Sequence, residues 1–393
     1  MSEKTPHVVV IGGGYAGVLA ANHLQQAPGI DITLVNPRPA FVERIRLHQL
    51  VAGTDDATEY YATLLGDRVR LVVDGAERID AGARRIELAS GTTLDYDYLV
   101  YAVGSTGAVP NAVSGAAEFA YPLAELEQAQ RLQARLRDIA TSAPIVVAGG
   151  GLTGVEAAAE LAEQGRPVTL VTNALAPSVG ASARRSLAKQ LTSLGVEIRD
   201  GATVAAVEAC AVLLADGTRL PSAVTVWTAG FGVPGLAAGS GLSTDPLGRL
   251  LTDETLTSVD DPHIIGAGDA VSPSGIPLRM SCQSALPLGA QAANTVLARI
   301  AGTEPTRISQ AFTGQCIGVG RRRGTIQISR GDDTPLRLHI GGRTAGLVKE
   351  QVCRLTLTFM RREARKPGAY LWLKNDWRDA LLADPTRQQV TAP

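Results

Sequence analysis

Two copies of one glycine-rich pattern constrain the fold of this chain more than any other feature. The first copy reads Gly12-Gly13-Gly14-Tyr15-Ala16-Gly17, and the second reads Gly149-Gly150-Gly151-Leu152-Thr153-Gly154. Each follows a short apolar run, at 8–11 or 145–148, and leads into an alanine-rich amphipathic stretch. A strand, tight turn and helix in this order is the context in which GxGxxG binds a dinucleotide. The two copies therefore predict two dinucleotides held by one chain.

The three glycines of each copy have separate roles, which are a tight turn, close approach of backbone N–H groups to a pyrophosphate, and close packing of helix on strand. In that order they are Gly12, Gly14 and Gly17 in the first copy and Gly149, Gly151 and Gly154 in the second. Tyr15 and Ala16 lie at the start of the first helix, where the partial positive charge of the helix faces the phosphates.

The similarity between the two units continues beyond the glycines. Short β-branched runs at 32–35 and 168–171 each predict a second strand. Each unit later has a hairpin-like turn and then a strand that ends in small residues. These are 90–92 and Tyr98–Gly104 in the first unit, and 216–218 and Val224–Gly230 in the second.

A further strand and glycine turn at Ile264–Asp269 follows the second unit, which predicts that this unit is inserted in the first. The expected fold class is α/β, with two Rossmann-like dinucleotide-binding domains, the second inserted in the first, and a small α+β C-terminal segment. The expected boundaries are 6–108 and 236–309 for the first domain, 109–235 for the second, 310–383 for the C-terminal segment and 384–393 for a disordered tail.

Composition and charge narrow the function further. The net charge of −1 provides no field that would attract nucleic acid. No leader-like start and no apolar run of spanning length is present, and the four cysteines are too far apart for a CxxC pair or a short-spaced zinc motif. We therefore expect a cytoplasmic protein with no metal site and no nucleic-acid partner.

The residues at the ends of the two second strands depart from the usual acid that binds ribose hydroxyls. Asn36 takes this position in the first unit and can still hydrogen-bond a ribose. Thr172 takes it in the second, where it removes a charge that would repel a 2′-phosphate, but no arginine directly follows it. Arg184 and Arg185 come later, on the expected next helix. The choice between NADH and NADPH stays open.

These motifs together resemble the two-dinucleotide-binding flavoproteins of the pyridine nucleotide–disulfide oxidoreductase superfamily. The chain is most similar to type II NADH:quinone oxidoreductases and to ferroptosis-suppressor-like (apoptosis-inducing-factor-like) quinone reductases, over roughly residues 6–365. The glycine loops, the strand at 96–104 and the stretch 264–270 are signals of the superfamily, whereas Cys282–Gly289 is the closer one. The resemblance implies a glutathione-reductase-like arrangement of the two domains.

The resemblance also assigns the cofactors, FAD to the first unit and NADH or NADPH to the second. For FAD it implies Gly12, Gly14, Tyr15, Ala16, Gly17, Asn36, Arg44, Ala102, Gly104, Gly268 and Asp269. For the nicotinamide cofactor it implies Gly149, Gly151, Gly154, Thr172, Ala229 and Gly230.

Three residues are implied near the reacting atoms. Glu156 completes the pattern GxGxxGxE, and in relatives this acid lies near nicotinamide and flavin, where it orients the carboxamide or relays protons; the alternative is an acid that only favours the helix dipole. His48 would donate a proton near the flavin, or else belong to a solvated or packing helix. Gln283 lies at the start of a helix expected from a Ser281 cap to Ile300, whose positive end would face the flavin pyrimidine ring.

Two departures in this segment leave the acceptor open. Cys282 stands where the quinone reductases have alanine, and Pro287 stands where they have a second glutamine. The acceptor is therefore a quinone or another planar, reducible molecule. The Cys282 thiol is either reactive at the helix N-terminus or a small buried apolar group.

The C-terminal segment breaks the repeat. We expect short strands at 325–329 and 336–340, followed by a basic amphipathic helix from Arg343 to Lys366 and by aromatic residues up to Trp377. One interpretation is peripheral contact of 343–377 with the inner face of an anionic membrane, which would suit a lipid-borne quinone. The other is a surface helix covering the flavin domain, or a contact in a homodimer.

The leading hypothesis is an FAD-dependent NAD(P)H oxidoreductase that passes hydride from NAD(P)H to flavin and electrons on to a quinone-like small molecule. A second hypothesis keeps the flavin and changes the acceptor, as in a tailoring dehydrogenase for an aromatic metabolite or a ferredoxin-type reductase. A third is an NAD(P)H-sensing interaction protein with low turnover.

Overall fold

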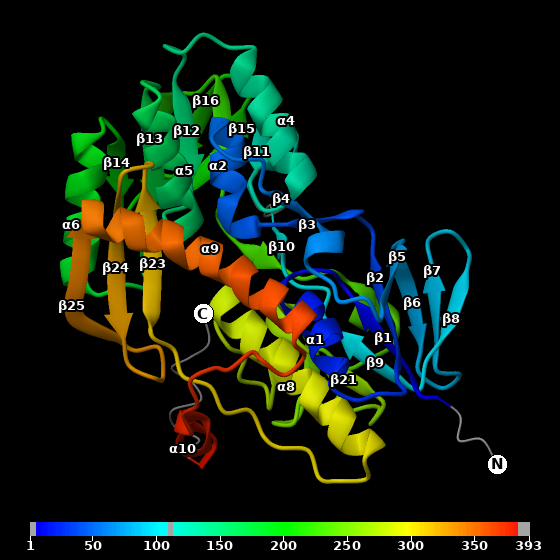
Figure 1. The fold of residues 1–393 in the computed structure, drawn as a ribbon. Helices are drawn as coiled ribbons and strands as arrows, with labels where there is room; N and C mark the ends of the chain where they lie inside the picture. Colours follow the sequence, from blue (N-terminus) through cyan, green and yellow to red (C-terminus); the bar gives the residue numbers. More distant parts are fainter. Residues whose placement is uncertain (1–4, 109–112, 384–393) are drawn as a thin grey trace.

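Two parallel five-stranded sheets form the framework of the chain. A computed structural model describes residues 5–108 and 113–383 (Figure 1). The first sheet has the order β21-β9-β1-β2-β5, with bounds Ile264–Gly266, Tyr98–Tyr101, His7–Ile11, Asp31–Asn36 and Val69–Val73. The second has the order β11-β18-β12-β13-β14, with bounds Ala120–Pro122, Val224–Trp227, Ile145–Ala148, Val168–Thr172 and Glu197–Asp200.

The central strands are apolar along their whole length because helices cover both faces of each sheet. In β1, Val8, Val9 and Val10 are fully buried, and β12 is buried throughout. The helices after the glycine loops are α1 (Tyr15–Leu24) and α5 (Leu152–Glu163). Helix α8 (Cys282–Ile300) packs along α1, as Figure 1 shows. This apolar pattern is the one expected for parallel sheets buried on both faces.

The order of strands confirms the predicted insertion. Strand β21 comes after the whole second unit in sequence, yet it pairs parallel with β9 of the first sheet. The α/β fold with two Rossmann-like units is therefore as expected. The predicted boundary at 109 lies outside the described residues, as does the tail 384–393.

Each unit carries a small antiparallel sheet at an equivalent place. These are β6-β7-β8 (Ala76–Asp80, Arg85–Leu88, Thr93–Asp95) and β15-β16-β17 (Val204–Glu208, Ala211–Leu214, Arg219–Pro221). The predicted turns at 90–92 and 216–218 connect strands of these sheets. Two-stranded pairs complete the strands: β3-β4 (Ala40–Val42, Thr58–Tyr60), β10-β19 (Thr106–Gly107, Phe231–Gly232) and β20-β22 (Leu250–Thr252, Val271–Pro273).

The remaining helices connect these strands. They are α2 (Leu47–Ala52), α3 (Ala116–Phe119), α4 (Leu126–Arg137), α6 (Ala181–Ser193), α7 (Leu236–Gly239) and α10 (Trp377–Ala383), with short 3-10 turns at Arg44–Arg46, Tyr61–Thr63 and Gly268–Ala270. Arg184 and Arg185 lie on α6, the helix where they were expected.

The C-terminal segment is an antiparallel sheet followed by a long helix. The sheet is β23-β24-β25 (Gly314–Val319, Arg323–Ser329, Pro335–Gly342), and the helix is α9 (Arg343–Arg365). The prediction included β24, β25 and α9 but missed β23, whose sequence GQCIGV lacks a clear alternation of apolar and polar residues. In Figure 1, α9 runs from this sheet to α1 and so spans both units.

Two strands are shorter than predicted, and the residues beyond their ends form loops instead. Strand β9 ends at Tyr101 and β18 ends at Trp227, whereas they were expected to reach Gly104 and Gly230. The extra residues form loops at the carboxyl edges of the sheets, where ligands bind in open α/β sheets. None of the helices in the described ranges combines the length and apolar character that a bilayer crossing needs.

Candidate functional site: a cavity between the two units and the C-terminal helix

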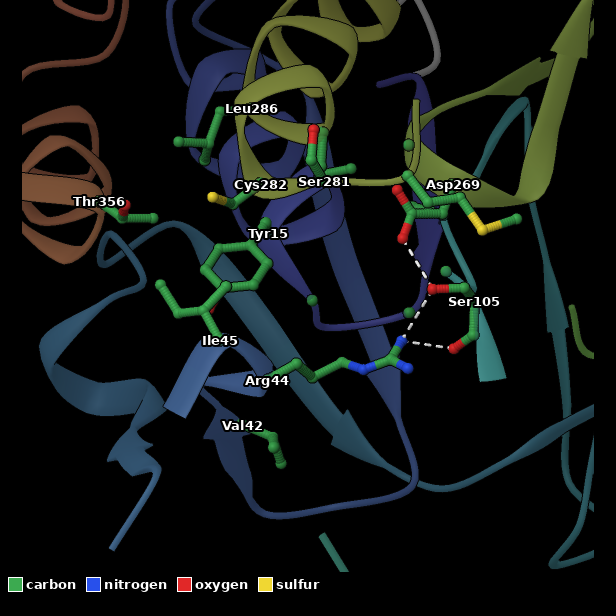
Figure 2. Close-up of a pocket in the computed structure, with 18 of the residues that line it drawn as sticks. Tyr15, Val42, Arg44, Ile45, Ser105, Asp269, Ser281, Cys282, Leu286 and Thr356 are labelled. Atoms are coloured by element: carbon green, nitrogen blue, oxygen red, sulfur yellow. Dashed lines mark hydrogen bonds between the residues drawn. The ribbon is translucent and has the colours of Figure 1, made fainter. Parts of the chain in front are cut away.

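A cavity of about 860 Å³ lies where the first glycine loop meets α5, α8 and α9. Figure 2 shows part of its wall, with Tyr15 between Cys282 and Ile45 and with Thr356 approaching from α9. The predicted residues that line it are Gly12, Gly14, Tyr15, Ala16, Asn36, Arg44, His48, Ala102, Gly104, Glu156, Gly268, Asp269 and Gln283. The fold thus brings the residues expected near FAD, except Gly17, together with all three expected near the reacting atoms.

The first glycine loop fits a dinucleotide in its shape. Gly12 has φ +101°, and a Cβ there would collide with the Ala102 carbonyl oxygen. A Cβ on Gly17 would collide with the Gly12 carbonyl oxygen, so that position needs glycine for helix packing. A Cβ on Gly14 would meet nothing within 4 Å and would project into open space. This open space beside a helix N-terminus is what a pyrophosphate requires.

The second glycine loop repeats this geometry. Gly149 has φ +116°, a Cβ on Gly154 would collide with the Gly149 carbonyl oxygen, and Gly151 faces open space. Among the described residues that line the cavity, this unit contributes Leu152, Thr153 and Glu156 of α5 but not the loop glycines, Thr172, Ala229 or Gly230. The second unit therefore reaches the cavity through the start of α5, and also through residues 123–125, Phe231 and Pro234.

Asn36 and Thr172 both support their glycine loops. The Asn36 side-chain oxygen accepts a hydrogen bond from Gly13 N at 2.9 Å, and its amide donates to Arg38 O at 2.9 Å. Thr172 Oγ1 donates to Ala174 O at 3.0 Å and packs against Gly150. Neither side chain is charged, and both are hydrogen-bonded to backbone beside their loops.

Arg44, Ser105 and Asp269 form a chain of contacts across the cavity wall (Figure 2). Ser105 Oγ donates to Asp269 Oδ2 at 2.7 Å, and Arg44 Nη1 donates to Ser105 O at 2.5 Å and to Ser105 Oγ at 3.1 Å. Burial raises the pKa of Asp269, although the Ser105 hydroxyl and Arg44 oppose this shift. Ser105 follows the predicted strand by one residue and was not among the predicted site residues.

Glu156, Lys349 and His48 meet at the cavity from three separate elements. Lys349 Nζ of α9 lies 2.9 Å from Glu156 Oε1, and His48 Nδ1 of α2 lies 3.7 Å from Glu156 Oε2. Burial acts to raise the pKa of Glu156, but Lys349, His48 and the Gly318 N–H at 2.9 Å outweigh it and hold that pKa below its usual range. Burial lowers the pKa of His48 to about 4, so its ring is neutral at pH 7.

The start of α8 forms another part of the wall. Ser281 caps the helix as expected, accepting from Ser284 N at 3.3 Å. The Gln283 amide is held on both sides, since Arg279 Nη2 donates to its oxygen at 3.0 Å and its nitrogen donates to Thr313 Oγ1 at 2.6 Å. Pro287 is buried inside the helix. Gln283 therefore presents a fixed amide to the cavity.

Three of the four cysteines line this cavity, although they are far apart in sequence. They are Cys282, Cys316 and Cys353, and all are free thiols. Burial raises the pKa of each of them, to about 11 for Cys353. The described residues contain no group of three or more potential ligands arranged to hold a metal ion.

With this geometry in view, comparison with known proteins identifies the class of the chain. The family model described as pyridine nucleotide-disulphide oxidoreductase matches residues 6–293. The chain belongs to this family, and it is an FAD- and NAD(P)H-dependent oxidoreductase.

Curated relatives agree with this assignment. An NADH dehydrogenase-like protein of Mycobacterium tuberculosis is 33% identical over 321 residues, which cover 74% of this chain and 80% of the relative. A type II NADH:quinone oxidoreductase of Staphylococcus haemolyticus is 26% identical over 397 residues, covering 90% of this chain and 95% of the relative.

Solved structures share the fold along nearly the whole chain. The sulfide:quinone oxidoreductase of Aquifex aeolicus matches with a TM-score of 0.79 at 20% identity, covering 97% of this chain and 96% of that one. The NDH2 structure of Plasmodium falciparum in complex with NADH matches with a TM-score of 0.77 at 16% identity, covering 93% and 99%.

Proposed function

We propose that this chain is an FAD-dependent NAD(P)H oxidoreductase that passes hydride from NAD(P)H to the flavin and two electrons on to a quinone-like small molecule. One observation carries the proposal: a single cavity is lined by the first glycine loop and also by Leu152, Thr153 and Glu156, which follow the second. A flavin bound there supplies the redox chemistry. The chain supplies binding, orientation and electrostatics.

The proposed residue roles follow from the contacts. Gly12–Gly17 and the half-buried Asp269 would hold FAD, and the start of α8 would place its partial positive charge beside the ring. Gln283, with its amide fixed by Arg279 and Thr313, would hydrogen-bond a ring or acceptor oxygen. Glu156, kept charged by Lys349, would orient the nicotinamide carboxamide or relay a proton.

The part of the cavity lined by α9 supports the proposal that the acceptor is quinone-like. Val352, Leu355 and Phe359 of α9 line the cavity and are also exposed to solvent, which gives it an apolar mouth. Quinones are planar apolar molecules with two carbonyl oxygens, and such a mouth suits them. Two staphylococcal relatives, of Staphylococcus haemolyticus and Staphylococcus epidermidis, are type II NADH:quinone oxidoreductases by name.

We further propose that the surface around this mouth rests on an anionic membrane. Leu347 of α9 is 71% exposed and Leu371 is 86% exposed, and Arg343, Arg362 and Arg365 lie on the same segment. Lys349 belongs to the helix that was predicted to be a basic amphipathic one, but it does not contribute to this charged face, because it is buried against Glu156. Exposed apolar side chains beside basic ones are typical of interfacial helices.

The first experiment is an anaerobic titration of the FAD-loaded protein with NADH and then with NADPH, followed by flavin absorbance. Bleaching by either nucleotide supports the proposal and identifies the donor, and reoxidation by ubiquinone or menaquinone analogues identifies the acceptor. A protein that does not retain FAD, or whose flavin is not bleached, would contradict it. Very slow reoxidation by every acceptor would favour the NAD(P)H-sensing alternative.

A second candidate is a flavin-dependent tailoring dehydrogenase or a ferredoxin-type reductase. Pro287 favours it, because this buried side chain cannot hydrogen-bond a quinone carbonyl as a glutamine could. Faster reoxidation by ferredoxin than by quinone analogues would support this candidate.

The membrane proposal has its own test. We expect the protein to sediment with vesicles that contain anionic phosphatidylglycerol, and Leu347→Glu together with Leu371→Glu to weaken this at least about tenfold. Leu338→Glu, at a 60% exposed position on β25, is the matched control and should sediment like wild type. Equal sedimentation of all three proteins would contradict the proposal.

A further inference from the structure

Glu160 is a buried carboxylate that the cofactor sites do not use. Its residue exposure is 3%, and its one ion-pair partner among the described residues is Arg321, whose Nη1 lies 4.0 Å from Oε1. That distance is too long for a hydrogen bond. Burial raises the pKa of Glu160 to about 7, with Arg321 opposing the shift and Glu163 and Glu156 adding to it. A carboxyl group in this state carries a proton part of the time at neutral pH.

Glu160 lies on α5 between a residue of the cavity wall and an exposed residue. It lies one turn after Glu156 on α5, and Glu163 follows almost one turn later, so the three side chains share one face of the helix. Glu156 is in the cavity wall, whereas Glu163 is exposed. The end of β23 and the turn after it lie along this face, since Gly318 N donates to Glu156 and Arg321 N donates to Glu163 Oε2 at 2.7 Å.

The reaction of the proposed function needs a proton at the buried end of this row. Reduction of a quinone follows NADH + H⁺ + quinone → NAD⁺ + quinol. The hydride supplies two electrons and one proton, so water must supply the second proton. Glu156 and His48 are buried, and the mouth of the cavity is lined by the apolar side chains Val352, Leu355 and Phe359. An acceptor that fills this mouth would cover it, so the proton would then need a path through the protein.

The charged groups around the row leave Glu160 as the group that can store a proton. Lys349 keeps Glu156 ionised, and His48 of α2 is neutral. Arg321 lies on the turn after β23, near two carboxylates. Its Nη1 is 4.0 Å from Glu160 Oε1, and its Nη2 is 3.9 Å from Oε2 of Glu350 on α9. At pH 7 Glu156 is ionised and the His48 ring is neutral, so neither stores the additional proton, although each can pass one on.

We propose that Glu160 takes a proton from the solvent side of α5 and passes it to Glu156 and His48 at the cavity wall, where a quinone-like acceptor consumes it. The O–H bond of the Glu160 carboxylic acid breaks and one forms on Glu156, which gives the proton to His48 or to the acceptor oxygen. Glu160 is then reprotonated from water near Glu163. Glu160 is a relay residue that touches neither cofactor nor acceptor, and the inference rests on the proposed function.

The first test needs no turnover. Infrared titration of the FAD-loaded protein should show a protonated carboxylic acid band with a component that disappears near pH 7. Glu160→Gln should remove this component and leave that of Asp333, whose pKa burial raises to about 6. Glu160→Asp should keep a band with a shifted midpoint. Glu118→Gln, which changes an exposed acid on α3, is the matched control and should leave the band unchanged. A component near pH 7 that persists in Glu160→Gln would overturn the inference.

The second test compares acceptors. In Glu160→Gln, bleaching of the flavin by NADH and reoxidation by ferricyanide, which takes electrons without protons, should stay within about twofold of wild type. Reoxidation by a quinone should slow at least about tenfold and lose its wild-type decline above pH 7. Equal slowing with both acceptors would indicate a structural role and refute the relay.

The two proposals fail in different ways. If wild type reduces quinone and Glu160→Gln does so equally fast at every pH, only the relay is refuted. If wild type reduces ferricyanide but no quinone, the proposed acceptor is refuted and the relay with it.

Discussion

Lys349 Nζ lies 2.9 Å from Glu156 Oε1, and this contact joins the C-terminal helix to the helix that follows the second glycine loop. Both side chains are largely buried, at 14% and 9% exposure. Burial acts to lower the pKa of Lys349, but Glu156 outweighs it and raises that pKa. The pair therefore keeps both charges across the neutral range and fixes α9 over the cavity.

Removing one partner should show how much this contact matters for stability. Lys349→Met leaves Glu156 as a buried charge without its cation, and we expect the free energy of unfolding in urea to fall by about 3 kcal/mol. Lys366→Met, which changes an exposed lysine after the same helix, should cost no more than about 0.5 kcal/mol. Equal losses in the two variants would show that the contact is not a stabilising one.

The ion pair also fixes the direction of a pH effect. The folded-state pKa of Glu156 is lowered, so its contribution is present above the ordinary value of 4.5 and is lost as pH falls through the folded value. The folded-state pKa of Lys349 is raised, so the contribution of this lysine to stability is present below its ordinary pKa of 10.5. The contribution is lost as pH rises through the folded-state value. The difference in stability between wild type and Lys349→Met should therefore be largest and flat between about pH 5 and pH 10, and a maximum outside this window would contradict the assignment.

His48 should make the protein less stable in mild acid. Its pKa is lowered from 6.5 to about 4 by burial, so between these values the unfolded chain binds a proton that the folded chain does not. Stability then falls as pH drops below 6.5. Relative to His48→Gln, wild type should lose about 2 kcal/mol between pH 8 and pH 5. The comparison at pH 8, where the ring is neutral in both states, serves as the control; parallel pH curves for the two proteins would argue against a neutral buried ring.

Two glycines of the first loop should separate folding from cofactor binding. Gly17→Ala places a methyl group against the Gly12 carbonyl oxygen, and we expect it to cost at least about 2 kcal/mol in the protein without FAD. Gly14→Ala meets nothing within 4 Å, so it should change that stability by no more than about 0.5 kcal/mol. It should nevertheless weaken FAD binding at least about tenfold, because its methyl group fills the space expected for the pyrophosphate. Unchanged FAD affinity in Gly14→Ala would place the cofactor elsewhere.

The sequence was sufficient for the framework of the fold because the framework repeats. The glycine loops, β1, β12 and the helices after them have strong local patterns, and Ile264–Gly266 could be placed as the returning strand. Strand β23 escaped detection because its glycines and Gln315 interrupt the alternation of apolar residues. Its role, covering α5 through Gly318, depends on tertiary packing.

The cavity was predictable on one side only. Residues near the glycine loops follow from motifs, and Asp269 and Gln283 follow from a resemblance. Lys349 and Ser105 have no local signal, since a lysine in a basic helix reads as a solvated charge and a serine after a strand reads as a turn. Their roles arise from contacts that are distant in sequence. Lys349 contacts Glu156, which is 193 positions away, and Ser105 contacts Asp269, which is 164 positions away.

The cavity thiols should react slowly although they line an open site. Burial raises the pKa of Cys282, Cys316 and Cys353, and the thiolate is the form that attacks an alkylating agent. With iodoacetamide at pH 7, we expect the exposed Cys210 to be modified first and these three at least about tenfold more slowly, as measured by mass spectrometry of the peptides. In urea all four should react at similar rates, which controls for local sequence. Rapid modification of Cys282 in the folded protein would instead identify a reactive thiol at the start of α8, the interpretation that its raised pKa disfavours.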